Sequence, residues 1–253
     1  ENSLDAAQER ARLRSAPLDL GLRERVGQFG FLAALSGFRS LVAAYLWIEA
    51  HNAWERTEWG RMAGLFDTVT TLQPRSPLYW DMAAWHMAWN ASTAALRDTA
   101  QPSEALRLRN QRQYFELGRN FLERGVRNNP ESSFLYSSLA VLLRDKFADH
   151  CGAGEAFLRA SQLPDAPPYV KRFAGYELAK CPGRESLAYR LLRKIYDEEP
   201  EARKPTLIST LQDCSPSASL KHTVGWGQTS RRIVWLLSSW RAAMLPQPSP
   251  TTC

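Results

Sequence analysis

Apolar side chains recur at spacings of three and four residues along most of the chain from Phe38 onward. Two such runs are Leu41, Tyr45 and Ile48, and Leu65, Val69 and Leu72. This spacing places side chains on one face of an α-helix, which has about 3.6 residues per turn. No stretch shows the sustained alternation of apolar and polar residues that a half-buried strand needs. The pattern therefore predicts an all-α fold with essentially no sheet.

Prolines divide the helical pattern at regular intervals. Pro74, Pro130, Pro164 and Pro200 each follow a helical stretch, and their separations are 56, 34 and 36 residues. Proline is common just after a helix end because it cannot continue the helix. A period of about 34 residues is typical of one class of two-helix repeat. The first spacing then holds one period and an insertion of 22 residues around residues 95–110. We expect the insertion to lengthen two helices; a projecting functional loop is the alternative.

The residues around each proline repeat in the same register. A bulky side chain six positions after the proline is followed four positions later by an alanine: Trp80 and Ala84, Tyr136 and Ala140, Val170 and Ala174. The same frame before Pro74 gives Leu46 and Ala50, and eight positions before the prolines stand Phe66, Leu122 and Leu192, with Phe157 one position out of step. An alanine lets two helices approach closely, and the bulky neighbour fills the space beside it. We therefore predict that these residues form the core.

These positions resemble the tetratricopeptide repeat family over about Phe38 to Pro200. The resemblance implies a right-handed solenoid of about four helical hairpins, with an insertion in the second. We accordingly divide the chain into an N-terminal arm (residues 1–37), a solenoid (38–200) and a C-terminal region (201–253) of capping helices and a disordered tail. A terminal repeat needs such a cap because its outer side is otherwise apolar.

A narrower resemblance rests on the stretches SGFRSLVAAYLWI (36–48), TTLQP (70–74) and AWHMAWN (84–90). They are similar to a group of uncharacterised bacterial tetratricopeptide proteins that carry an N-terminal membrane anchor. The resemblance implies a periplasmic, membrane-associated protein whose anchor lies upstream of Glu1. The longest apolar stretch of the chain, residues 29–50, is interrupted by polar and charged side chains and is not a membrane span.

The resemblance also predicts a binding face, because the first helix of each hairpin lines the concave side in this family. Stepping by three and four along these helices also selects Ser137 and Val141. The predicted contact residues are Trp47, His51, Trp54, Asp81, Met82, Trp85, Trp89, Arg144, Lys171 and Arg172. Such an aromatic surface that becomes basic at one end would bind the apolar anchors and carboxylates of a partner helix or peptide. The expected function is a protein-binding scaffold or a subunit of a membrane-associated complex. The alternative for the tryptophans is a place in the core.

The basic charge of the chain is also compatible with a second class of function. The net charge is +6, and six arginines between Arg107 and Arg127 lie on or beside one predicted helix. A second basic segment surrounds Ile233, Leu236, Leu237, Trp240 and Met244, which fit either a capping helix or a docking helix. These features would suit a peripheral membrane or nucleic-acid binder, although a solvated basic surface explains them as well.

Candidate chemistry is sparse. Motifs for nucleophilic, phosphate-binding and dinucleotide-binding sites are absent, and the histidines lack metal-ligand spacing. We predict no enzyme activity, no cofactor, no metal and no small-molecule substrate; a helical hydrolase that uses Glu49 and Asp81 is the weaker alternative. Cys151 and Cys181 stand near equivalent turns of consecutive repeats and are candidates for a disulfide, although inert thiols fit the sequence equally well.

Overall fold

The computed structural model describes residues 38–214, and this part of the chain is helical with no strand, which confirms the all-α prediction. The predicted N-terminal arm, the basic segment around Trp240 and the tail lie outside the described residues. The α-helices are α3 (Arg39–Glu55), α4 (Trp59–Leu72), α5 (Pro77–Trp85), α6 (Ser92–Arg97), α7 (Glu104–Asn128), α8 (Ser133–Phe147), α9 (His150–Ser161), α10 (Tyr169–Leu178), α11 (Glu185–Glu198) and α12 (Pro205–Asp213).

Prolines follow several helix ends, and side-chain caps mark several helix starts. Helices α4, α7, α9 and α11 each end two or three residues before one of the four regularly spaced prolines. Several of the helix starts have side-chain caps: the Ser132 hydroxyl accepts a hydrogen bond from the Leu135 amide (3.3 Å), and the Asp149 carboxylate accepts one from the Gly152 amide (2.8 Å). Each cap satisfies an amide that has no partner within its helix.

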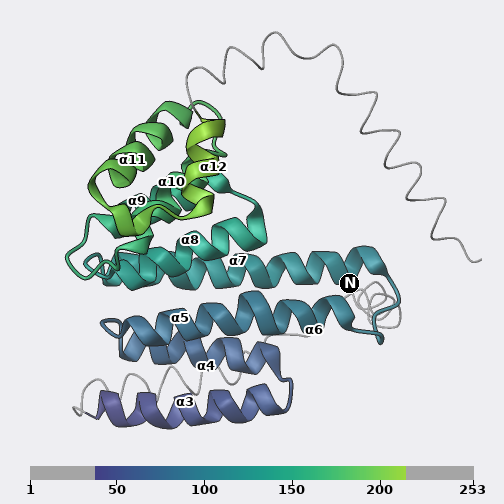
Figure 1. The fold of residues 1–253 in the computed structure, drawn as a ribbon. Helices are drawn as coiled ribbons and strands as arrows, with labels where there is room; N and C mark the ends of the chain where they lie inside the picture. Colours follow the sequence, from purple (N-terminus) through teal and green to yellow (C-terminus); the bar gives the residue numbers. More distant parts are fainter. Residues whose placement is uncertain (1–37, 215–253) are drawn as a thin grey trace, which may run out of the picture.

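The helices pair in chain order, α3 with α4, α5 with α7, α8 with α9 and α10 with α11, and the pairs follow one another through the molecule (Figure 1). The core residues predicted from the proline register are buried, with Tyr136 half-buried. The core consists of three successive clusters, the last of which includes Leu207 and Leu211 of α12. Helix α12 thus covers part of the apolar side of α11.

The insertion lengthens the second pair. Helix α5, the π-helical segment η1 (His86–Ala91) and α6 run on without a break in helical backbone, and α7 packs along all three. Gly118 of α7 allows a close approach, because a Cβ on this residue would lie 2.8 Å from the Ala88 Cβ of η1. A π-helical turn holds an extra residue, and such turns are frequent at functional sites.

A disulfide joins the third and fourth pairs. Cys151, at the start of α9, is bonded to Cys181, just after α10, with a Cα–Cα distance of 4.9 Å. Beside it, the His150 Nδ1 lies 2.7 Å from Oε2 of the buried Glu177, whose other oxygen accepts a hydrogen bond from the Lys180 Nζ at 3.1 Å. Covalent and polar contacts therefore tie the start of α9 to the end of α10.

Candidate functional site

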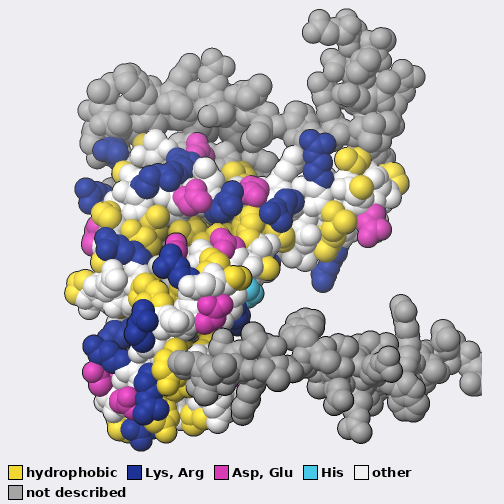
Figure 2. Space-filling view, turned by 90° about the horizontal axis from the view of Figure 1, so that it is seen from above, with side chains coloured by type: hydrophobic (Ala, Val, Ile, Leu, Met, Phe, Trp, Pro, Cys, Tyr) yellow, Lys and Arg dark blue, Asp and Glu magenta, His cyan; other side chains and the backbone are white. Residues whose placement is uncertain are grey.

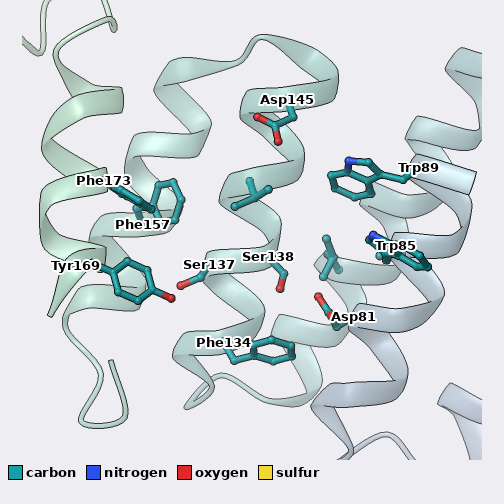
Figure 3. Close-up of a pocket in the computed structure, with 13 residues that line it drawn as sticks. Asp81, Trp85, Trp89, Phe134, Ser137, Ser138, Asp145, Phe157, Tyr169 and Phe173 are labelled. Carbon is teal, nitrogen blue, oxygen red and sulfur yellow. The ribbon is translucent and has the colours of Figure 1, made fainter. Parts of the chain in front are cut away.

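A cavity of about 430 Å³ lies where α5 and η1, α8 and α10 meet (Figure 3). We call it the aromatic groove. Its floor is one face of α8, formed by residues at spacings of three and four: Phe134, Ser137, Ser138, Val141 and Asp145. The spacing that makes α8 helical therefore also gathers these side chains on the side that faces the groove.

Aromatic side chains from two other helices face each other across α8. Trp85 and Trp89 form one wall, and Tyr169 and Phe173 of α10 form the other. The Phe173 ring is anchored on the buried Phe157 ring, with 5.6 Å between centroids. Of the aromatic residues in the groove, Trp85, Phe134 and Tyr169 keep 44–46 % of their surface exposed. The groove therefore has an aromatic rim that is open to solvent.

Two carboxylates line the groove, and they differ in their surroundings. Asp145 accepts a hydrogen bond from the Arg144 Nε at 2.7 Å. Asp81 is bonded to the Ser138 side chain; burial raises the pKa of Asp81, and this hydrogen bond opposes the rise only in part. Asp145 is therefore paired with an arginine, whereas Asp81 lies in a partly desolvated place where its partner is a serine.

A cation packs against Trp89, one of the wall residues of the groove. The Lys146 Nζ lies 4.7 Å from the Trp89 ring centroid and 5.3 Å from that of Phe115. Burial lowers the pKa of Lys146, and the charge of Asp145 acts in the opposite direction. An ammonium at this distance from an aromatic face is attracted by the negative potential above the ring. Trp89 is consequently engaged on one side, and Trp85 is the more open of the two tryptophans.

Behind Trp85 lies a buried histidine. The His86 ring contacts the rings of Trp85, Phe66 and Trp54 at centroid distances of 5.0, 5.5 and 5.9 Å, and its Nδ1 pairs with the Asn90 amide at 3.1 Å. Burial lowers the pKa of His86 to about 4, with a further contribution from His51. This wall of the groove therefore rests on a neutral aromatic cluster at physiological pH.

The structure brings together some of the sequence-predicted contact residues. Asp81, Trp85 and Trp89 line the groove with Ser137 and Val141. Trp47 instead packs on the core between the Phe66 and Tyr79 rings, and Trp54 lies against His86. The predicted residues that do not line the groove are Trp47, His51, Trp54, Met82, Arg144, Lys171 and Arg172. Within the described residues, the groove lining contains two aspartates and no Lys, Arg or His.

The wall formed by α10 and part of the floor formed by α8 were not predicted from the sequence. Continuing the steps of three and four from Ser137 and Val141 would have given Phe134, Ser138 and Asp145. Tyr169 and Phe173 are four residues apart and therefore share one face of α10. Neither Lys171 nor Arg172 lines the groove. The spacing of the residues thus indicated both the floor residues of α8 and the aromatic pair of α10. It did not indicate which face of each helix lines the groove.

The basic run on α7 is largely engaged within the molecule. Arg119 pairs with Glu116 and Glu123, and Arg124 donates to Asp67 at 2.6 Å. The guanidinium groups of Arg112 and Arg119 each lie 4.9 Å from the Phe147 ring centroid. Figure 2 shows Lys and Arg side chains interspersed with acidic and apolar ones on the face it presents.

Other candidate sites find less support in the described range. Glu49, the second acid of the hydrolase alternative, pairs with Arg61 at 2.8 Å and does not line the groove with Asp81. No cluster of three metal-ligating side chains occurs between residues 38 and 214. None of the described helices combines the length and the apolar character that a bilayer crossing requires.

Comparisons of the chain with protein-family models, with curated proteins and with solved structures found no match.

Proposed function

We propose that this protein is a tetratricopeptide-like helical solenoid that works as a binding scaffold, and that the aromatic groove holds a helix or extended segment of another protein. The observation that carries the proposal is the aromatic rim. Trp85, Phe134 and Tyr169 come from three different helices, converge on one opening and remain about half exposed. Large aromatic side chains that converge around a concave site are typical anchors of protein interfaces.

The shape of the groove favours a polypeptide over a compact ligand. The floor extends along α8 from Phe134 to Asp145, which corresponds to roughly 16 Å of helix axis. Its side chains recur over about three helical turns, with Phe134 and Val141 as the apolar ones two turns apart, and this length suits a partner that presents anchors on successive turns. Exposed apolar surface of this kind marks interaction sites on soluble proteins.

We further propose that the scaffold works outside the cytoplasm, in association with a membrane. The Cys151–Cys181 disulfide supports this location, because disulfides persist in oxidising compartments and are rare in reducing ones. The similarity of residues 36–48, 70–74 and 84–90 to anchored bacterial proteins points the same way.

Affinity capture from the membrane fraction of the native host tests the scaffold role. The wild-type chain is compared with Trp85→Ala and with Leu108→Ala, which removes an exposed apolar side chain of α7 outside the groove. We expect a partner that is retained by Leu108→Ala and lost by a folded Trp85→Ala variant. Equal capture by all three proteins would place the interface elsewhere on the molecule.

A further inference from the structure

The unpaired carboxylate of Asp81 gives the aromatic groove a charge preference. Within residues 38–214, Asp81 has its hydrogen bond with Ser138 and no ion pair. In the view of Figure 3 its carboxyl group lies between Trp85 and Phe134 in the groove. A carboxylate that keeps its charge where water is partly excluded is stabilised by a cation that can reach it.

Among residues 38–214, the charged groups around the groove leave this position open. Arg144 is bound to Asp145, and Lys146 lies against the Trp89 and Phe115 rings. The wall residue near Asp81 is Trp85, and this residue is 44 % exposed. A carboxylate beside an open indole ring binds an ammonium or guanidinium by two contacts, one to the carboxylate and one to the ring face.

We propose that the occupant of the aromatic groove is a partner segment that places a Lys or Arg side chain between Asp81 and Trp85, with apolar side chains on either side of it. This inference rests on the proposed function, because it specifies the partner of the same groove. This partner segment is basic. The face predicted from the sequence had a basic end and would have selected an acidic partner instead. The apolar neighbours of the cation contact Phe134 and Tyr169, one or two helical turns away.

Peptide selection tests the charge preference and does not require the partner to be identified. A phage library of amphipathic helical peptides, with the central position of the apolar face randomised, is panned on the full chain. Parallel selections use Asp81→Asn, Trp85→Ala and Asp197→Asn. Asp197→Asn changes the net charge by the same amount as Asp81→Asn but removes an exposed carboxylate of α11, outside the groove.

The expected result is enrichment of Lys and Arg at the central position on the wild-type chain and on Asp197→Asn, with this enrichment lost on Asp81→Asn. A selected basic peptide should bind Asp81→Asn on the order of tenfold more weakly, as expected for one charge-assisted hydrogen bond. Peptides with apolar anchors but no basic preference would overturn the inference and leave the proposed function standing. Peptides that bind Trp85→Ala and the wild type equally tightly, or no selected peptides at all, would overturn both this inference and the proposed function.

Discussion

The stability of this protein should fall in mildly acidic solution because of one buried histidine. His86 has a pKa of about 4, whereas a histidine in an unfolded chain titrates near 6.5. The folded-state pKa is lower than the unfolded one, so between these values the unfolded state binds a proton that the native state does not. The contribution of neutral His86 to stability is therefore complete above about pH 6.5 and is lost progressively as the pH falls toward 4.

The size of the effect follows from the difference between the two pKa values. Each unit corresponds to about 1.4 kcal/mol, so the complete shift is worth roughly 3 kcal/mol and the loss between pH 8 and pH 5 about 2 kcal/mol. The sources of the shift are burial among the rings of Trp54, Phe66 and Trp85, and the nearby His51. A substitution that keeps a ring in this cluster but removes the titration should abolish this part of the pH dependence.

Urea unfolding followed by circular dichroism at pH 8 and pH 5 measures the effect in the wild type and in His86→Phe. Carboxylates contribute equally in both proteins, so the difference between their pH dependences isolates His86. We expect the wild type to lose about 2 kcal/mol more than His86→Phe between the two pH values. The same loss in both proteins would show that His86 is accessible to protons in the folded state and would refute the reasoning.

Three further predictions concern the packing of the helices. Gly118→Ala should lower the free energy of unfolding by roughly 1–2 kcal/mol, because its Cβ meets the facing alanine of η1. Gly64→Ala on α4 should raise the free energy of unfolding by up to about 1 kcal/mol, because a Cβ there has nothing within 4 Å. Urea unfolding measures both changes. The double variant Cys151→Ser, Cys181→Ser should lose roughly 2–4 kcal/mol, and a reducing agent should lower the melting temperature of the wild type but not that of the variant. Trp80→Ala should cost about 3–5 kcal/mol in the same denaturation assay, because this ring is 1 % exposed.

The course of the helices and the core were predictable because both follow from local signals. Proline positions mark helix ends through the chemistry of a single residue, and spacings of three and four identify a buried face within one helix. Trp80, Leu122 and Val170 were assigned to the core on this basis and are buried. Helix α9 ends four residues after Phe157, whereas the corresponding helices of the other units end six residues after their core residue, so Phe157 is out of step with its proline and still buried.

The binding face was harder to predict, because it depends on how each helix is rotated against its neighbours. One residue corresponds to a rotation of about 100°, so Arg144 points away from the position that Asp145 occupies in the groove. Trp47 was placed on the concave face, but it is covered by Phe66 and Tyr79 from the two following helices. The π-helical turn that contains Trp89 also changes the angular spacing, and no single residue of the sequence predicts such a turn.

The most direct test of the scaffold role is photo-crosslinking from inside the aromatic groove. A benzoylphenylalanine residue replaces Phe134 at the rim in one protein and Leu108 on α7 in another, and both are irradiated in the native membrane fraction. We expect a crosslinked protein partner from position 134, no such product from position 108, and loss of the product when Trp85→Ala is added. Crosslinks to the same partner from both positions, or from position 108 alone, would contradict it.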